Sequence, residues 1–229
     1  MTELLRLGQD PTWLSYPLST DTPAYGGGEG LSVSPITSIA AGDTANTLQL
    51  RFPNHLGTHV DLPAHFFEAG PTLDDYQATD WVFNRPMLVD VDTESGALVD
   101  RHHIEGRIPD ETDLLLIRTG HGRNRGTPGY WEGGPGLSPD LALWLRDACP
   151  DIRAVGMDLI SVTSRLRREA GRAAHRAFLD PAGVGRPIRL IEDMRLYDCP
   201  TELRWVLVSP LSLRGADGAP VTVWGFQQA

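Results

Sequence analysis

Short apolar runs bounded by turn-forming residues recur along the chain, which is the pattern of strands in a sheet. The runs cover residues 47–52, 87–91, 113–118, 154–158, 204–208 and 221–224. Two further short strands are expected near residues 13–17 and 31–39, within a first segment rich in Pro and Gly. These repeated strands predict a sheet-based core.

Two helices are expected among the strands. Ser138 followed by Pro139 and Asp140 has the composition of a helix N-terminus, and apolar residues then recur with helical spacing up to residue 148. A second helix is expected over residues 169–179. Because the chain has no internal repeat and no linker-like run, residues 1–229 are predicted to form a single α/β domain with more strand than helix.

Composition and charge argue against several classes of protein. Of 229 residues, 41% are hydrophobic and 22% are charged, and no apolar stretch approaches the roughly 20 residues that span a bilayer. The formal net charge of −10 would repel a phosphate backbone, so neither a membrane nor a nucleic acid is an expected partner. Residues 1–6 lack a secretory signal, which predicts a cytoplasmic protein in which Cys149 and Cys199 are unpaired thiols.

The densest metal-ligand chemistry lies in residues 55–65, which read His-Leu-Gly-Thr-His-Val-Asp-Leu-Pro-Ala-His. The Pro and Gly residues in and before this segment disfavour a helix, and an extended segment would place ligands on one face and packing residues on the other. The ligand face would consist of His55, Gly57, His59 and Asp61, with Gly57 leaving room for an ion. Imidazole and carboxylate ligands suit an open hydrolytic site, whereas a structural zinc site prefers thiolates. A strand whose histidines only form hydrogen bonds is the alternative, which this density of ligands disfavours.

Two further ligands are expected from the second half of the chain. If residues 188–194 are extended, Glu192 falls on the apolar face, where a carboxylate is costly unless it is paired or binds a metal. Asp193 would face the other way with two arginines and form a surface salt bridge. His175 is the metal-competent group among small neighbours, although the pattern by itself favours a structural histidine.

The remaining histidines are weaker candidates. His102 and His103 lie in a polar connection and are expected at the surface. His121 follows a predicted strand, so it is expected either at the mouth of a pocket or at the surface.

Residues 55–65 resemble the HxGTHxDxPxH signature of the cyclase family, which are metal-dependent hydrolases that include bacterial kynurenine formamidases and isatin hydrolases. The resemblance extends over nearly the whole chain. It covers residues 13–18, 42–43, 115–120, 136–139, 156–161, 175–179, 191–192 and 209–211. It implies a fold of the swivelling β/β/α type, with a mixed sheet or barrel-like β core and flanking helices.

By this resemblance, the site would hold one or two divalent ions, Zn²⁺ or Mn²⁺. His55 and His59 would bind one ion and His175 the second, Asp61 and Glu192 would bridge them, and His65 would transfer protons. Further residues would support the site or contact the substrate. Asp158 and Ser161 would orient ligands by hydrogen bonds, Asp43 and Asn46 would shape the cleft, and Tyr25 and His121 would bind substrate.

The expected reaction is hydrolysis of a small molecule with a C–N or ester bond, such as an aryl formamide, a lactam or a lactone. A metal-dependent cyclase or dehydratase acting on a polyketide-like intermediate is the alternative, because the same Lewis acid and base can drive ring closure. A third hypothesis is that the protein binds metal without catalysing a reaction. Relatives commonly form homodimers or tetramers, and Trp13, Tyr16 and Tyr25 are expected at such an interface.

Overall fold

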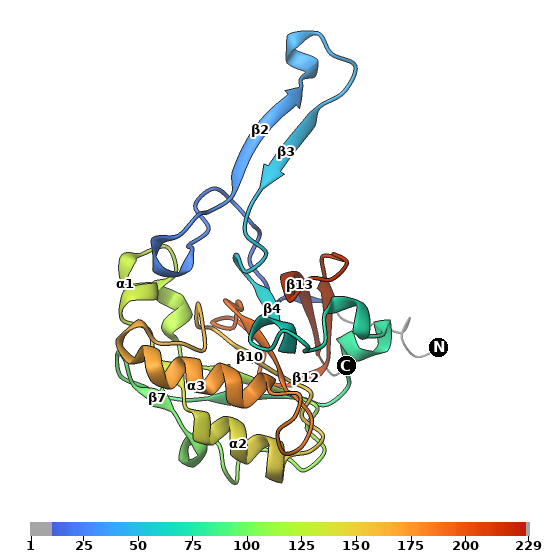
Figure 1. Ribbon diagram of the computed structural model, residues 1–229. Helices are drawn as coiled ribbons and strands as arrows, with labels where there is room; N and C mark the ends of the chain where they lie inside the picture. Colours follow the sequence, from blue (N-terminus) through green and yellow to red (C-terminus); the bar gives the residue numbers. More distant parts are fainter. Residues whose placement is uncertain (1–10, 228–229) are drawn as a thin grey trace.

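A sheet that curls until its two edges nearly meet forms the body of the molecule, and the computed structural model describes residues 11–227 of it (Figure 1). The main sheet has nine strands, eight of them in the order β5-β12-β13-β4-β11-β10-β8-β6, with β1 added at β13. The edge strands β5 (Val82–Phe83) and β6 (Pro86–Asp90) are joined by Asn84 and Arg85 alone. Opposite edges joined by so short a connection require a curled, nearly closed sheet, which confirms the predicted α/β fold with a barrel-like core.

One half of the sheet is parallel and carries the helices. Strands β6, β8 (Leu114–Arg118), β10 (Ala154–Met157) and β11 (Arg189–Glu192) run parallel. The helices α2 (Pro139–Ala148) and α3 (Arg168–Leu179) form the crossovers between them. Buried apolar residues of both helices pack with the parallel strands into one core. Strand β8 is fully buried from Leu114 to Ile117 because it is covered on both faces.

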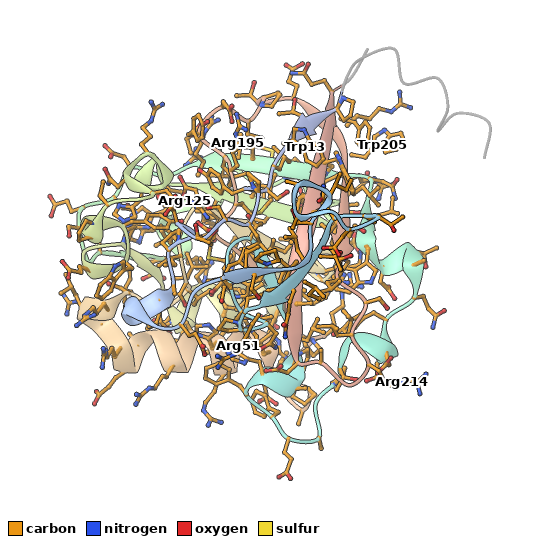
Figure 2. All side chains as sticks on the ribbon, turned by 90° about the horizontal axis from the view of Figure 1, so that it is seen from above. Trp13, Arg51, Arg125, Arg195, Trp205 and Arg214 are labelled. Atoms are coloured by element: carbon orange, nitrogen blue, oxygen red, sulfur yellow. The ribbon has the colours of Figure 1, made fainter. Side chains whose placement is uncertain are left out.

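The other half of the sheet is antiparallel. It contains β1 (Thr12–Trp13), β12 (Leu203–Pro210) and β13 (Gly218–Gln227), and its inner face forms a second core with residues of β4 and β11. Strand β4 (His59–Asp61) joins the halves, because it pairs antiparallel with both β11 and β13. Strands β12 and β13 form an antiparallel hairpin. Figure 2 shows Trp13 of β1 beside this hairpin, where it pairs with Trp224 of β13.

The predicted helix over residues 138–148 is confirmed. The Ser138 hydroxyl accepts a hydrogen bond from the Leu141 amide at 3.0 Å, and Pro139 occupies the first helical position. Helix α3 begins one residue before the predicted 169–179 segment. Helix α1 (Pro128–Glu132) was not predicted, because its five residues are too few to show an apolar period.

A two-stranded arm projects from the body (Figure 1). It consists of β2 (Ser32–Thr37) and β3 (Thr47–Arg51), which pair only with each other. Residues 47–52 were expected to lead into the ligand segment as a strand, and the strand forms, but outside the body. Asp43 and Asn46 accept hydrogen bonds from backbone amides near the tip of the arm, so the prediction that they shape the cleft of this chain is wrong.

The remaining elements are short. Strands β7 (Leu98–Val99) and β9 (Gly136–Leu137) pair in parallel. Single 3-10 turns cover Tyr25–Gly27, Ile39–Ala41, Pro63–His65, Leu73–Asp75, Ala78–Trp81, Arg101–His103, His121–Asn124 and Arg165–Arg167. Within residues 11–227, none of the helices has the length and apolar character needed to cross a bilayer.

Candidate metal centre

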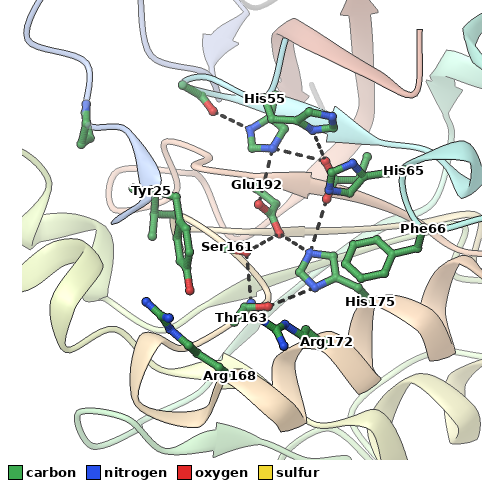
Figure 3. A pocket seen from close by; sticks show the side chains of 15 residues that line it. Tyr25, His55, His65, Phe66, Ser161, Thr163, Arg168, Arg172, His175 and Glu192 are labelled. Carbon is green, nitrogen blue, oxygen red and sulfur yellow. Dashed lines mark hydrogen bonds and ion pairs between the residues drawn. The ribbon is translucent and has the colours of Figure 1, made fainter. Parts of the chain in front are cut away.

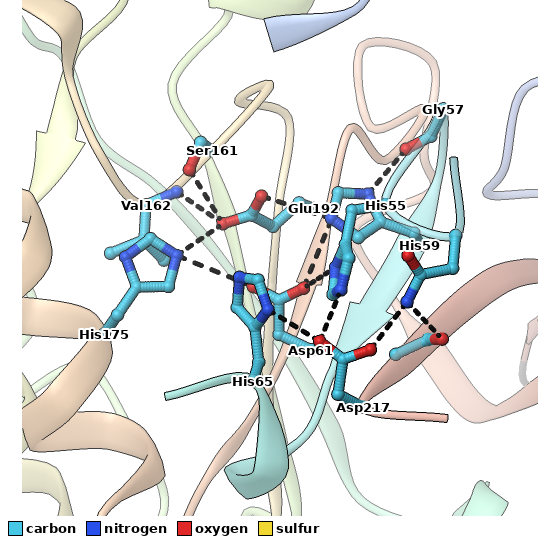
Figure 4. A network of polar contacts seen from close by, with 12 residues as sticks. His55, Gly57, His59, Asp61, His65, Ser161, Val162, His175, Glu192 and Asp217 are labelled. Carbon is cyan, nitrogen blue, oxygen red and sulfur yellow. Dashed lines mark hydrogen bonds and ion pairs between the residues drawn. The ribbon is translucent and has the colours of Figure 1, made fainter. Parts of the chain in front are cut away.

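The pairing of β4 with β11 brings three ionisable side chains together. His59 and Asp61 are two residues apart on β4 and therefore point to the same face. Glu192 on β11 lies directly opposite His59 in the register, and Leu190 lies opposite Asp61. Helix α3 adds His175 to the same point (Figure 4). Four residues from three segments of the sequence are thus brought together by one strand pair and one helix.

The four side chains form a closed ring of contacts. His59 Nε2 lies 3.3 Å from Asp61 Oδ1 and 3.5 Å from Glu192 Oε2. His175 Nε2 lies 3.5 Å from Asp61 Oδ2 and 3.4 Å from Glu192 Oε1. Each carboxylate therefore directs one oxygen toward His59 and the other toward His175. All four residues are buried.

Backbone contacts orient both imidazoles. The Nδ1–H of His59 donates to the Gly57 carbonyl at 2.9 Å, and the Nδ1–H of His175 donates to the Gly171 carbonyl at 2.9 Å. Phe66 stacks on His175 with ring centroids 4.8 Å apart. Because Nδ1 carries the hydrogen in each neutral ring, both Nε2 lone pairs point at the carboxylates.

This arrangement fits a divalent cation. Charge-assisted N–H···O bonds are usually about 2.7–2.9 Å long, so contacts of 3.3–3.5 Å are too long for strong ones. Two ligand atoms that are each about 2.1 Å from a tetrahedral ion lie about 3.4 Å apart. With neutral imidazoles, the ring contains only lone pairs and negative charge, which a cation would balance. His55, His59 and Asp61 form one group of potential ligands, and Asp61, His175 and Glu192 form another.

Without a cation, protons bound to His59 and His175 balance the negative charge of the two carboxylates. Burial disfavours the imidazolium of His59, but the hydrogen bond and charge of Asp61 outweigh burial and raise the pKa to about 9. Burial is likewise outweighed at His175, where Asp61 and Glu192 raise the pKa to about 10. Burial would raise the pKa of Asp61, yet its hydrogen bonds to the histidines hold it well below its usual value. A metal ion must therefore displace protons from this site.

Asp217 completes the site and was not found by sequence analysis. Its Oδ2 lies 2.9 Å from His65 Nδ1 and 3.0 Å from His55 Nε2, and Asn54 donates to its Oδ1 at 2.7 Å. His55 also contacts Asp61 Oδ1 through Nδ1 at 2.8 Å. Burial lowers the pKa of His55, but its contacts with the two carboxylates raise it overall. Asp217 sits in a polar turn just before β13, so only the β13–β4 pairing reveals it.

The two residues expected to support the ligands have different surroundings. The Ser161 hydroxyl donates to Glu192 Oε1 at 3.2 Å, beside a 2.7 Å bond from the Val162 amide to the same oxygen. Asp158 is buried, but its carboxylate accepts from Thr119 and Gly120 and contacts none of the proposed ligands among the described residues. Its predicted role beside the ligands is wrong; it anchors a loop at the end of β8.

His121 lies away from the metal centre. Its Nε2–H donates to the Tyr130 carbonyl at 2.9 Å, and its side chain lines a separate hollow with Asn124 and Gly133. The expectation that it binds substrate in the metal pocket is therefore wrong, and the loop after β8 turns it aside. His102 is exposed, and His103 is half-buried at a turn where it accepts a hydrogen bond from the Asp100 amide.

The structure contradicts the prediction that Asp193 is a surface residue. Its side chain is 1% exposed, Arg125 binds both carboxylate oxygens at 2.8–3.1 Å, and the Tyr130 hydroxyl donates at 2.6 Å. Strand β11 ends at Glu192, and Asp193 has a φ of 50°, so strand alternation does not continue to it. Burial is the largest influence on Asp193 and raises its pKa despite Arg125.

The ligand segment is less extended than predicted. Only His59–Asp61 form a strand, and Gly57 has a φ of 68°. A Cβ on Gly57 would lie 2.6 Å from Leu18 Cδ2. The positive φ and the approach of Leu18 therefore favour glycine at this position, and Gly57 also lines the cavity beside the proposed ligands.

A cavity of about 390 Å³ opens onto this centre (Figure 3). Tyr25 and Phe66 contribute aromatic surface, and Arg168 and Arg172 of α3 contribute positive charge. His55, His59, Asp61, His65, His175 and Glu192 all line it. Its volume lies in the range of small-molecule sites.

Comparisons with known proteins agree with this architecture. A family model described as putative cyclase matches residues 12–164, a segment that includes the ligand stretch but not His175 or Glu192. Cyclase-like protein 2 of Oryza sativa subsp. japonica is 32% identical over 221 residues, covering 91% of this chain and 76% of that protein. Kynurenine formamidase of Bacillus anthracis is 27% identical over 212 residues, covering 91% and 93%. The structure of isatin hydrolase A from Labrenzia aggregata superposes with a TM-score of 0.78 at 18% identity, covering 96% and 94%.

Proposed function

Because this chain belongs to the cyclase family, whose members include hydrolase-like enzymes, we propose that it is a metal-dependent hydrolase acting on a C–N bond of an aryl formamide or a cyclic amide. The observation that carries this proposal is the ring of Nε2 and carboxylate atoms at 3.3–3.5 Å, a spacing suited to metal ligands. The similarity to kynurenine formamidase supports the choice of bond.

The proposed ligands are His55, His59, Asp61, His175 and Glu192, holding one or two ions of Zn²⁺ or Mn²⁺. Such an ion supplies Lewis acidity and lowers the pKa of water toward neutrality. The orientation of the carboxylates, each with one oxygen toward His59 and one toward His175, supports a bridging role for Asp61 and Glu192. Ser161 and the Val162 amide hold Glu192 in place.

We assign proton transfer to His65. Its Nδ1–H donates to Asp217, which leaves Nε2 to take a proton from the attacking water and return it to the leaving nitrogen. Asp217 orients the ring through this contact. His65 also belongs to a group of potential ligands with His55 and Asp217, and the metal content of the His65→Ala variant distinguishes a base from a ligand.

A metal-dependent cyclase, dehydratase or lactone hydrolase is the alternative. The identity with the plant cyclase-like protein, 32%, exceeds that with kynurenine formamidase, 27%. Oxygen from labelled water appears in the product of hydrolysis and is absent from the product of cyclisation. A purely non-catalytic role is disfavoured by the cavity that opens onto the proposed ligands.

The test is hydrolysis of N-formylkynurenine and of isatin by protein reconstituted with zinc or with manganese, each with a chelator control. We expect metal-dependent release of product with kcat/KM of about 10⁴ M⁻¹s⁻¹ or more, the ordinary range of enzymes. Bound metal without turnover of either compound would reject C–N hydrolysis and favour the alternative.

We further propose that the protein is a homo-oligomer in which the arm packs on a second copy. Val33 lies opposite Leu50, and Pro35 lies opposite Leu48, so these residues share one apolar face. Val33, Leu48 and Leu50 are 40–58% exposed within one chain. Although the net charge is −10, Asp43 is the one ionisable residue between positions 30 and 50, so two arms can meet without strong repulsion. A two-stranded hairpin is also marginally stable unless it packs against something.

The proposed interface differs from the expected one. It adds the arm to the expected contacts of Trp13, Tyr16 and Tyr25, which stay a prediction; Trp13 and Tyr25 are 52% and 37% exposed within one chain. Cytoplasmic location also remains a proposal, which the free thiols of Cys149 and Cys199 support.

A further inference from the structure

We infer that Arg168 and Arg172 form an anion subsite at the mouth of the metal pocket, and that the substrate carries a carboxylate at the end remote from the bond that is cleaved. This inference rests on the proposed hydrolase and adds the substrate's second recognition group. Both arginines line the same cavity as the proposed ligands.

The sequence of α3 places the two arginines and one ligand on one face. Arg168, Arg172 and His175 are separated by four and three residues, which is the spacing of neighbours on a helix surface. At 1.5 Å per residue, Arg172 lies about 4.5 Å and Arg168 about 10.5 Å along the axis from His175. The backbone positions of the two arginines are therefore displaced from that of His175 along the helix by distances comparable to a substituted aromatic ring.

Neither arginine has an acidic partner among residues 11–227. Arg118, Arg125, Arg153 and Arg195 each form an ion pair at 2.5–3.1 Å. Arg168 and Arg172 form no such pair with any residue from 11 to 227, and both are exposed at the pocket mouth. In an acidic protein, two unpaired arginines beside a buried metal centre leave a local excess of positive charge available to a ligand.

The space between the arginines and the ligands is bounded by aromatic side chains. Tyr25 lines the cavity, and Figure 3 shows its hydroxyl end directed toward Arg168. Phe66 lines the cavity on the side of His175. A flat substrate would fit with its reacting group at His65 and the ligands, its ring near Tyr25, and its anionic group at the arginines. Paired guanidinium groups bind carboxylates through charge-assisted hydrogen bonds.

The test uses a binding measurement that needs no turnover. Zinc-loaded protein is titrated calorimetrically with 4-acetamidobenzoate and with acetanilide, which lacks the carboxylate. We expect 4-acetamidobenzoate to bind about tenfold to a hundredfold more tightly, the effect of one or two hydrogen bonds to a charged group. The preference should disappear in the R168Q/R172Q double variant and be partly retained in R168K/R172K.

Arg167→Gln is the matched control. Arg167 lies next to Arg168, is exposed, and does not line the cavity, so this variant removes one positive charge, as R168Q alone does, without touching the subsite. If R167Q lost the preference for 4-acetamidobenzoate to the same extent, the preference would come from the net charge of the protein and the inference would be overturned. Unchanged preference in R168Q/R172Q would also overturn it and place the carboxylate on the metal.

Kinetics with 4-formamidobenzoate and formanilide extend the test to catalysis. We expect the arginine variants to raise KM for 4-formamidobenzoate by a larger factor than KM for formanilide. If neither compound is hydrolysed, the proposed reaction fails while the titration still decides the subsite. If formanilide is hydrolysed and the titration shows no carboxylate preference, the subsite fails while the reaction stands.

Discussion

At the scale of single residues, the partners of the two ring nitrogens indicate the roles of His59, His175 and His65, whereas both nitrogens of His55 contact carboxylates. In His59 and His175, Nδ1 is bound by a backbone carbonyl and Nε2 faces carboxylates. In His65, Nδ1 is bound by Asp217 and no ring of carboxylates surrounds Nε2. The first pattern is that of metal ligands, and the second is that of an oriented base.

Single substitutions should therefore separate turnover from metal content. We expect His65→Ala to keep its metal and lose about 10²-fold to 10⁴-fold in kcat, because proton transfer is lost. His59→Ala and Asp61→Ala should lose metal as well, measured by elemental analysis after dialysis. Equal metal loss in all three variants would make His65 a ligand and contradict its assignment as the base.

Metal binding should tighten as the pH rises. With pKa values of about 9 and about 10, His59 and His175 are protonated at neutral pH without metal, whereas a metal requires the neutral rings. Apparent affinity should therefore increase from about pH 6 to about pH 9. Calorimetry in two buffers of different ionisation enthalpy would measure the release of protons. Affinity that does not change with pH would contradict these shifts.

The same shifts act on stability with the opposite sign when the metal is absent. A raised histidine pKa stabilises the folded protein fully below its unfolded value of about 6.5, and this gain is lost as the pH rises through the folded values. Thermal unfolding should show metal-free protein losing stability from about pH 6.5 to about 10. Metal-loaded protein, whose two rings are neutral, should not share this loss.

At the scale of secondary structure elements, three of them define the site. The short strand β4 presents His59 and Asp61, β11 aligns Glu192 against His59, and α3 carries His175. The turn before β4 is as constrained as the strand, since the Gly57 carbonyl orients His59. A side chain at Gly57 would disturb both the turn and this hydrogen bond.

Gly57→Ala should lower stability and weaken metal binding together. Gly57 combines a φ of +68° with Leu18 Cδ2 at 2.6 Å from a built Cβ, whereas Gly106 has a φ of +77° and nothing within 4 Å. Gly106→Ala therefore controls for backbone strain, which costs about 1 kcal/mol or more. Denaturant unfolding should show a larger loss for Gly57→Ala, and only this variant should bind zinc less tightly. Equal losses of stability and unchanged metal affinity would contradict this account.

At the scale of the whole molecule, the site lies where the parallel and antiparallel halves of the sheet meet. Strand β4 (His59–Asp61) has β11 (Arg189–Glu192) on one side and β13 (Gly218–Gln227) on the other, so one segment from the first half of the chain meets two from its last quarter. The arm leaves the body in the segment between Tyr25 of the pocket and the ligand stretch (Figure 1). Assembly through the arm would therefore constrain both walls of the site.

Charge on the apolar face of the arm should dissociate the oligomer. L48D/L50D places two carboxylates on this face, whereas S34D/Q49D places the same charge on the opposite face. Light scattering should give a multiple of 25.1 kDa for the wild type and for S34D/Q49D, and the monomer mass for L48D/L50D. A monomeric wild type at working concentration would end the proposal.

Local features of the structure could be read from the order of residues. The α2 helix follows from its cap at Ser138 and its apolar spacing, because helix starts and periods depend on neighbours within a few positions. Most strands were recognised for the same reason. The histidines and Asp61 of residues 55–65 were found because metal ligands cluster there in the sequence itself.

Contacts between distant segments were set by the tertiary structure. Asp217 meets His55 and His65 only because β13 pairs with β4, and Asp193 is buried only because Arg125 and Tyr130 fold over it. Residues 47–52 have the pattern of a core strand, yet they form the arm. An apolar pattern states that a face must be buried, but the surface that buries it depends on the packing of the whole chain and, for the arm, on the proposed second copy.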